Sequence, residues 1–397
     1  MDRRKIESLM VAGLFCLLLF NLHLPGQERI AKKIVEYGWD VPYPEFVRDH
    51  IQEMETRPFE GIIFRTKGFN HVFDLRPWEK EKLQPQLDAL SRIRWGKFTD
   101  NFLTLYSASK WGMDWYNDEH WKTIEENLKL FSLAVKTGNC VGVCFDPEPY
   151  DTDPWVFQGN TKDKSFAEVC LQVRQRGKQF IQALEAHTPE LKLLSFFQFG
   201  LYDAILDEPD AKVRQQKLQK QWMVLLPAFY QGIVEGAGPK TVIIDGNETA
   251  YYYEDSERFF RAYHTIRQRA LSLVPEELRT KYHEQVQVGM ALYIDQVMGV
   301  RPRDVLSHYM PHEDQLKFFE HNVYYALTTT DKYVWCYSER MNWWLEPEKA
   351  GKDRKLPEGV EAALISAREK YIAGKSLGFD IKDIIVKARK QKKQKKK

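Results

Sequence analysis

Short apolar segments alternate with amphipathic helical segments along most of the chain, and this alternation constrains the fold more than any other feature. Eight such pairs can be assigned between residues 30 and 375 from apolar periodicity and turn signals. The expected strands are residues 33–38, 61–65, 102–106, 140–145, 192–199, 241–245, 286–294 and 333–337. The expected helices are residues 44–55, 79–93, 118–136, 166–186, 211–235, 256–273, 313–328 and 358–373.

Strands that are joined by helices are expected to be parallel, so the chain belongs to the α/β class. Eight strand–helix pairs are the number that closes a (β/α)8 barrel, the TIM barrel, and a span of residues 30–375 fits one such domain with long loops. The alternative is an open, doubly wound sheet. That fold usually carries a glycine-rich phosphate turn after its first strand, and residues 38–42, Gly-Trp-Asp-Val-Pro, do not form one.

The two ends of the chain differ in composition from the body. Residues 1–25 combine Arg3, Arg4 and Lys5 with an apolar run over residues 9–20, which predicts an export signal or an uncleaved anchor. The folded part is therefore expected outside the cytoplasm, in the periplasm or the extracellular space, and an anchor would attach it to the membrane. Residues 387–397 hold eight Lys or Arg and no acid, which predicts a basic disordered tail.

The charge balance argues against a nucleic-acid partner. The net charge of the whole chain is +2, and the basic tail accounts for all of it, so the body is mildly acidic. No P-loop or dinucleotide fingerprint is present, and no Cys or His residues have zinc spacing. We therefore expect neither a cofactor nor a metal ion.

The fourth expected strand ends in two carboxylates. In residues 141–150, Asp146 and Glu148 lie two positions apart and therefore share one face of the strand, while Pro147 and Pro149 prevent further regular pairing. The carboxyl end of a barrel strand is where such enzymes keep their chemistry. The structural alternative is that Asp146 caps a turn and Glu148 is solvated.

Aromatic and charged residues also follow the other expected strands. Seven of the 11 Trp residues fall in these loops. Indole rings pack well on the apolar C–H faces of sugars, and carboxylates and amides bond to sugar hydroxyls, so the pattern predicts a carbohydrate partner. The expected lining residues are Trp39, Asp40, Arg65, Lys67, Trp111, Trp115, Tyr150, Trp155, Asn247, Glu248, Tyr293, Asp295, Tyr337, Glu339 and Trp343.

Glycoside hydrolysis needs two carboxyl groups that flank one bond. Glu148 is the candidate acid, and Asp245 at the end of the sixth strand is the first choice as its partner. Asp146 could raise the pKa of Glu148 by like charge, or act itself. The alternative partners are Asp295, Glu339 and Glu248. These residues also have purely structural interpretations. Asp245-Gly246 is a turn signal, Glu339 could pair with an arginine, and Trp343 among the lining residues could seal the end of the barrel.

With these residues, the chain resembles a bacterial glycoside-hydrolase-type barrel over nearly all of its length after the N-terminal segment. Asp146-Pro147-Glu148 resembles the closing Asp-x-Glu of the chitinase-like group, and Glu148-Pro149 resembles the Glu-Pro of the large retaining clan. Pro147 stands where that clan has Asn, and the earlier aspartates of the chitinase-like motif are absent. A third clan, with an Asp nucleophile on strand four and an Asp acid on strand six, would select Asp146 and Asp245. The resemblance implies an exported glycosidase acting on a poly- or oligosaccharide, without a numbered family.

Two other function classes are considered. A non-catalytic carbohydrate-binding barrel would keep the aromatic mouth and need no acid pair. A metal-dependent hydrolase is disfavoured because the strand ends lack the inward His residues that such sites use. Arg65, Lys67 and Arg340 are compatible with an acidic or sulfated sugar.

Overall fold

The computed structural model describes residues 31–39, 42–157, 163–344 and 355–395. The expected export segment, residues 1–25, and Asp40 lie outside the described residues. Among the residues described, no helix combines the length and the apolar composition needed to cross a membrane.

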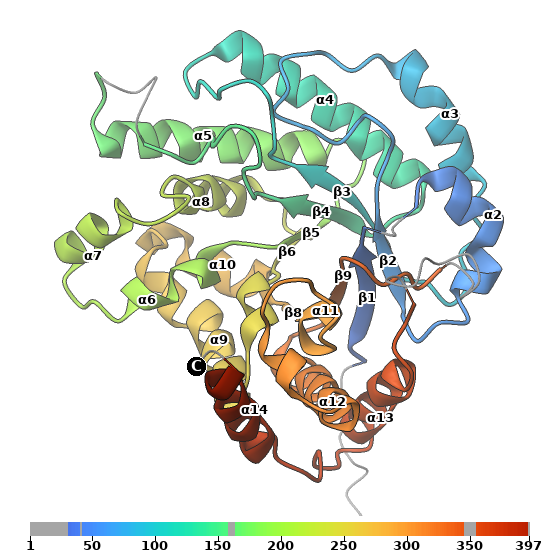
Figure 1. The fold of residues 1–397 in the computed structure, drawn as a ribbon. Coiled ribbons are helices and arrows are strands. Elements are labelled where there is room, and N and C mark those ends of the chain that lie inside the picture. Colours follow the sequence, from blue (N-terminus) through green and yellow to red (C-terminus); the bar gives the residue numbers. More distant parts are fainter. Residues whose placement is uncertain (1–30, 40–41, 158–162, 345–354, 396–397) are drawn as a thin grey trace, which may run out of the picture. The chain divides into compact units, whose positions relative to one another are not determined.

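A single parallel sheet forms the centre of the molecule, with helices around it (Figure 1). Its strands are β1 (Lys33–Gly38), β2 (Gly61–Phe64), β3 (Phe102–Tyr106), β4 (Gly142–Asp146), β5 (Lys192–Ser195), β6 (Val242–Asp245), β7 (Val286–Val288), β8 (Met290–Tyr293) and β9 (Tyr333–Ser338). The strand order is β7-β6-β5-β4-β3-β2-β1-β9-β8, and every pairing is parallel.

The two ends of this order meet in the chain itself. β7 pairs with β6 and β8 pairs with β9, and only Gly289 separates β7 from β8. They are the halves of the expected seventh strand, so the sheet is closed and the expected (β/α)8 barrel is confirmed. A side chain at the break would be crowded, because a Cβ on Gly289 would lie 3.0 Å from the Cγ2 atom of Ile244 and 3.2 Å from the Asp245 carbonyl oxygen.

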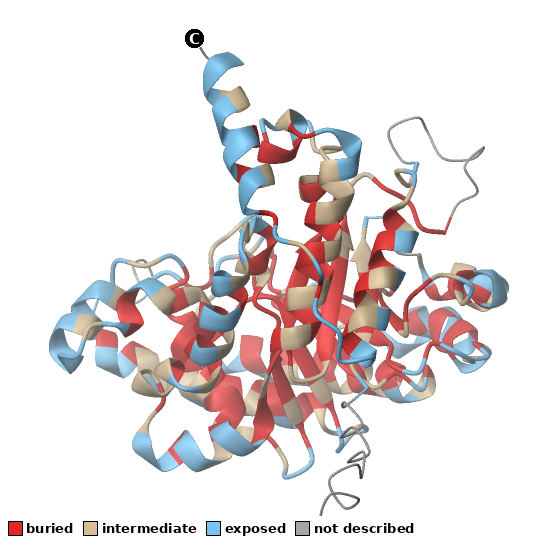
Figure 2. Ribbon diagram, turned by 90° about the horizontal axis from the view of Figure 1, so that it is seen from below, coloured by how far each residue is buried: buried red, intermediate tan, exposed pale blue. Residues whose placement is uncertain are grey.

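Eight longer helices follow the strands of the barrel. They are α2 (Pro44–Met54), α3 (Lys80–Ser91), α4 (Asp118–Thr137), α5 (Phe166–Leu184), α8 (Leu226–Gly236), α9 (Ser256–Arg267), α12 (His312–Thr329) and α13 (Val360–Ile372). Buried positions concentrate on the strands and on the inward faces of these helices, as Figure 2 shows. Such one-sided burial is what the apolar periodicity of the helical segments predicts.

Shorter helices lie in the connections. They are α6 (Asp203–Leu206), α7 (Ala211–Leu218), α10 (Arg279–Gln285), α11 (Ile294–Val297), and the 3-10 helices η2 (Phe199–Tyr202), η3 (Glu248–Tyr252), η4 (Arg269–Ser272), η5 (Glu276–Leu278) and η6 (Leu306–Tyr309). The expected single helix over residues 211–235 is wrong, since α7 and α8 are separate. Met223 between them has a positive φ of 56°, and Pro227 lies in the first turn of α8.

The basic C-terminal segment also differs from the expectation. Residues 387–395 belong to helix α14 (Lys382–Lys395), so the predicted disordered tail is wrong for them. Ile385 and Ala388 are buried against the body, and the side chains of Arg389 and Lys392 form ion pairs with Glu254 and Asp304. Apolar contacts and ion pairs with the body thus offset the repulsion among the lysines.

At the N-terminal ends of the strands, the buried carboxylate of Asp100 contacts residues from several strands. Asp100 accepts a hydrogen bond of 2.5 Å from the Tyr333 hydroxyl. The ammonium groups of Lys33, Lys192 and Lys332 lie 3.7, 3.5 and 3.4 Å from its carboxylate. Burial disfavours the ionised form of Asp100, but the Tyr333 hydrogen bond and the lysine charges outweigh it and lower its pKa to about 2.

Replacement of this carboxylate is expected to destabilise the barrel. The pKa of Asp100 is lower in the folded than in the unfolded chain, so its stabilisation is complete above pH 4 and is lost as the pH falls towards 2. Asp100→Asn should therefore lower the free energy of unfolding by about 2 kcal/mol at pH 7. Urea unfolding at several pH values measures this, with exposed Asp88→Asn on α3 as the control. Equal stability of wild type and Asp100→Asn at pH 7 would contradict the prediction.

Candidate active site

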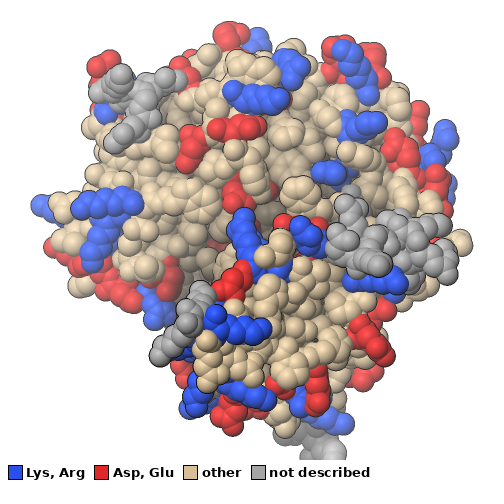
Figure 3. Space-filling model, in the orientation of Figure 1, with Lys and Arg blue, Asp and Glu red and all other residues tan. Residues whose placement is uncertain are grey.

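A pocket of about 550 Å³ lies at the carboxyl ends of the strands. Its walls come from the segments that follow β1, β2, β3, β4, β5, β6, β8 and β9, so the whole ring of strand ends contributes. Figure 3 shows acidic and basic side chains close together around a hollow near the middle of the face in view. This is the end of the barrel at which the sequence placed the site.

The segment after β4 holds Glu148 in the pocket wall. The Glu148 backbone N–H donates to Asp146 Oδ1 over 2.9 Å, and the Tyr150 hydroxyl donates to Glu148 Oε2 over 2.6 Å. The indole N–H of buried Trp155 donates to the carbonyl oxygen of Pro147 over 2.7 Å. These bonds fix the backbone on both sides of Glu148 and stabilise its carboxylate. Both Asp146 and Glu148 line the pocket, as predicted from their shared face.

The segment after β6 places a different carboxylate in the pocket from the one first expected. Asp245 is only 1 % exposed and does not line the pocket. Its carboxylate accepts backbone N–H bonds from Gly200 (2.8 Å) and Asn247 (3.2 Å), and burial raises its pKa to about 7. The turn reading of Asp245 fits this geometry. The turn, with Asn247 at φ 46°, delivers Glu248 to the pocket instead.

Glu248 stands in an environment that disfavours its ionised form. Burial raises its pKa well above the usual range, and the charges of Asp146 and Glu148 raise it further. No hydrogen bond to its carboxylate is found among the described residues. Burial likewise raises the pKa of Asp146 to about 7, helped by the charge of Glu148 and opposed by the N–H of the Glu148 backbone. The pocket therefore brings together Glu248, whose pKa is raised, and Glu148, which accepts a hydrogen bond from the Tyr150 hydroxyl.

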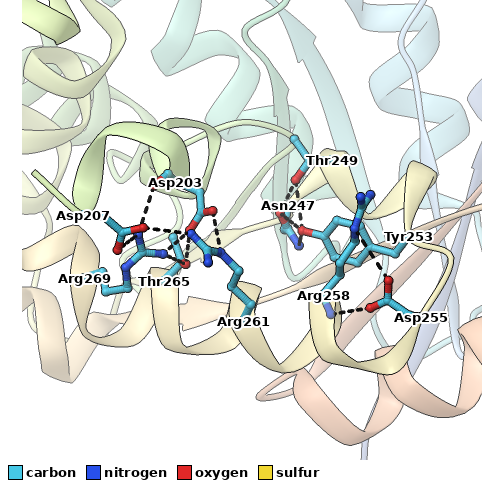
Figure 4. Close-up of polar contacts among 10 residues, drawn as sticks. All are labelled: Asp203, Asp207, Asn247, Thr249, Tyr253, Asp255, Arg258, Arg261, Thr265 and Arg269. Atoms are coloured by element: carbon cyan, nitrogen blue, oxygen red, sulfur yellow. Dashed lines mark hydrogen bonds and ion pairs between the residues drawn. The ribbon is translucent and has the colours of Figure 1, made fainter.

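Hydrogen bonds and ion pairs connect the segments after β5 and β6 to α9 and η4, as Figure 4 shows. Asp203, directly after η2, accepts a hydrogen bond from Arg261 Nε over 2.8 Å and also pairs with Arg269. This fastens the segment that contains Gly200 to α9 and η4. Asn247 donates to the Tyr253 hydroxyl over 3.3 Å. Asn247 is buried and does not line the pocket, so it supports the loop rather than contacting a ligand.

The aromatic lining is made of tyrosine and not, as expected, of tryptophan. Trp115, Trp155 and Trp343 are buried in the core, and Trp111 packs under the guanidinium of Arg76 outside the pocket. Trp39 alone of the expected tryptophans lines the pocket. It is 74 % exposed and donates its indole N–H to the Tyr337 hydroxyl over 2.6 Å. The burial of Trp115, Trp155 and Trp343 follows from the large apolar area of the indole ring, which is stabilised when it is removed from water.

Tyrosine rings pack against one another on one side of the pocket. Tyr251 and Tyr337 are stacked with ring centroids 5.6 Å apart, and Tyr37 stacks on Tyr337 at the same distance. Tyr293 lies 4.9 Å from Tyr337. All four rings line the pocket. They provide flat apolar faces together with hydroxyl groups that can donate and accept hydrogen bonds.

The wall after β8 and β9 is electrically balanced. Glu339 accepts a hydrogen bond from the Tyr293 hydroxyl and lies 3.8 Å from Arg301 Nε. Asp295 is fully buried, and its two oxygens accept the backbone N–H groups of Glu339 (2.9 Å) and Arg340 (2.8 Å). Asp295 therefore shapes the loop, while Glu339 reaches the pocket with its charge compensated.

Several pocket residues were not among the predicted ones. They are Asn70, His71, Tyr106, Asp151, Phe196, Tyr252, Arg301 and Arg303, together with Tyr37 and Tyr251. Most of them lie at the ends of strands, so their position in the sequence could have identified them as pocket residues. Arg301 and Arg303 follow α11, and no sequence pattern indicated that they line the pocket. Lys67 is exposed and does not line the pocket. Within the described residues, no group of three or more His, Cys, Asp or Glu side chains is placed to hold a metal ion.

Comparison with known proteins bears on the architecture. No family model matches the chain, and no curated protein does. One similar solved structure is a native Bacteroidetes-affiliated GH5 cellulase linked with a polysaccharide utilization locus, with 10% identity and a TM-score of 0.47 over 88% of this chain and 90% of that chain. Another is GH5_18 from Streptomyces cattleya in complex with GlcNAc, with 13% identity and a TM-score of 0.48 over 86% and 80%. Both likenesses are of fold alone.

The protonation of Glu248 can be measured directly. We expect infrared difference spectra of wild type and Glu248→Gln to show a protonated carboxyl band at pH 7 that is absent from the variant. Asp146→Asn removes a like charge, so the pKa of Glu248 should fall and the band should disappear at a lower pH. Asp151→Asn, a change of the same kind in another residue of the pocket wall, is the control. A band that is missing at pH 7, or unmoved by Asp146→Asn, would refute this electrostatic account.

Proposed function

We propose that the protein is a glycosidase in which Glu248 is the general acid and Glu148 is the base or nucleophile. The observation that carries the proposal is the meeting of two carboxyl groups, from the segments after β4 and β6, in one pocket, where the pKa of Glu248 is raised and Glu148 accepts a hydrogen bond from Tyr150. Pairs of titratable groups whose environments push their pKa values apart are the pattern of acid–base catalysis. The sequence suggested Glu148 as the acid. The proposal gives that role to Glu248, because Glu248 is the carboxyl group whose pKa is raised.

The chemistry follows from the two environments. Glu248 holds a proton that it can transfer to the glycosidic oxygen as the C–O bond breaks, which turns the leaving group into a neutral alcohol. The Glu148 carboxylate, stabilised by the Tyr150 hydroxyl, then either takes a proton from an attacking water or bonds to the anomeric carbon. Asp146 is a positioning residue, since it binds the Glu148 backbone and its charge helps to keep Glu248 protonated.

A carbohydrate substrate is supported by the pocket walls. Tyr37, Tyr251, Tyr293 and Tyr337 line the pocket, and Trp39 adds a largely exposed indole that can pack on the C–H side of a sugar. Their hydroxyl groups and the carboxylates can bond to sugar hydroxyls. A volume of about 550 Å³ is within the range of small-molecule sites. We propose a poly- or oligosaccharide that places one end or one short segment in this pocket.

We further propose that the protein is exported to the periplasm or beyond, with residues 1–25 as a signal or anchor that would bind it to the membrane. The support is the sequence alone, namely the basic start and the apolar run over residues 9–20. Deletion of residues 2–25 should retain the protein in the cytoplasmic fraction, as measured by cell fractionation and immunoblotting. An unchanged distribution between fractions would contradict export through this segment.

The two carboxyl groups should respond differently to the leaving group. Glu248→Gln is expected to lower kcat by about 10²- to 10⁴-fold on an unactivated oligosaccharide. The loss should be much smaller on an aryl glycoside with an acidic phenol, because that leaving group needs no proton. Glu148→Gln should abolish turnover of both. Steady-state kinetics with a panel of sugars measures this, with exposed Glu119→Gln on α4 as the control.

Two outcomes would overturn the proposal. Full activity of Glu148→Gln would exclude it from the reaction. Sugar binding by the wild-type protein that never yields product, and that survives both substitutions, would identify a carbohydrate-binding barrel without catalysis.

A further inference from the structure

We propose that the substrate carries a negative charge, a carboxylate or a sulfate ester, and that Arg65 binds it. This inference rests on the proposed function and deepens it by assigning the class of sugar. It concerns the wall of the pocket after β2, which the acid–base mechanism does not use.

Arg65 directly follows β2 and lines the pocket. Its Nε atom is buried and has no hydrogen-bond partner, and its guanidinium carbon lies 5.3 Å from the centre of the Tyr43 ring. Among the described residues, no carboxylate lies within ion-pairing distance of Arg65. A buried guanidinium N–H without an acceptor costs free energy, and an acceptor on a ligand would remove that cost.

The catalytic carboxylates do not neutralise Arg65. Asp146, Glu148 and Glu248 line the same pocket, but none of them forms an ion pair with Arg65 in the described structure. Arg301 shows the contrasting case in the same pocket, because it lies 3.8 Å from Glu339. Arg65 is thus a pocket-lining cation whose counter-ion is not supplied by the described part of the protein.

The surroundings of Arg65 suit an oxyanion. A planar guanidinium binds two oxygens of a carboxylate or sulfate at once, which a lysine cannot do. Asn70 lies in the same segment, lines the pocket and is only 6 % exposed, so its amide can donate a further hydrogen bond. Exposed Arg303 also lines the pocket and adds to its positive potential. Arg65 and Asn70, from one segment, are therefore the residues assigned to one negatively charged substituent.

The experiment compares matched charged and neutral sugars. The first pair is an oligogalacturonate and its carboxyl-reduced counterpart, and the second is a sulfated galactan oligosaccharide and its desulfated counterpart. Binding to Glu148→Gln protein is measured by calorimetry, so that the readout does not depend on turnover, and kcat/KM is measured on the active protein. The wild type is expected to prefer the charged member of at least one pair, and which pair it prefers distinguishes the carboxylate from the sulfate.

Substitutions assign the preference to Arg65. Arg65→Gln should lower the charged-to-neutral selectivity by about 10- to 100-fold, the worth of a charge-assisted hydrogen bond. Arg65→Lys keeps the positive charge but not the planar guanidinium that binds two oxygens at once, so the charged-to-neutral selectivity should fall by an intermediate amount. Arg76→Gln is the matched control, because Arg76 also stacks on an aromatic ring, with 5.1 Å from its guanidinium carbon to the Trp111 ring, but does not line the pocket.

The outcomes separate this inference from the proposed function. Cleavage of neutral sugars at least as well as charged ones, with selectivity unmoved by Arg65→Gln, would overturn the inference and leave the glycosidase standing. Binding of charged sugars that depends on Arg65 without any cleavage would support the subsite and overturn the glycosidase. If Arg65→Gln does not fold, as judged by thermal unfolding, Arg65→Lys carries the test, and its unchanged selectivity would overturn the inference.

Discussion

Closure of the sheet at Gly289 is the constraint on which the rest of the molecule depends. The two half-strands on either side of this residue pair with opposite neighbours, β6 and β9, so one continuous piece of chain joins both edges of the sheet. The Gly289 N–H also donates to the Asp245 carbonyl oxygen over 2.7 Å. Because the barrel is closed, the carboxyl ends of all its strands face one pocket, and Glu148 and Glu248 meet there although they are far apart in the sequence.

The charged groups of the pocket differ in whether they have an ionic partner. Asp146 and Glu148 both act on Glu248, and together with burial their charges raise its pKa. Arg301 is paired with Glu339. Arg65 stands without an acidic partner within the described chain.

Position along a strand was a better guide to the site than residue type. The shared face of Asp146 and Glu148 placed both correctly, because side chains alternate along a strand whatever surrounds it. Asp245, the first choice as the partner, does not line the pocket, because the turn after β6 uses its carboxylate to bind two backbone N–H groups. Glu248, held as an alternative, reaches the pocket in its place. Among the three clan motifs compared with the sequence, the one with carboxylates on strands four and six is most similar to the placement of Glu148 after β4 and Glu248 after β6.

The sequence by itself determined the eightfold alternation, the closed barrel and the position of the site, because these follow from apolar periodicity and the alternation of side chains, which are local properties. Tertiary structure alone decided which side chains line the pocket and which of them hold protons. Trp115 and Trp155 became core residues because neighbouring rings cover them, and the pKa of Glu248 is raised because its carboxyl group is shielded from water and lies near Asp146 and Glu148. Burial and electrostatic environment depend on contacts between distant segments, which the pattern along one chain does not contain.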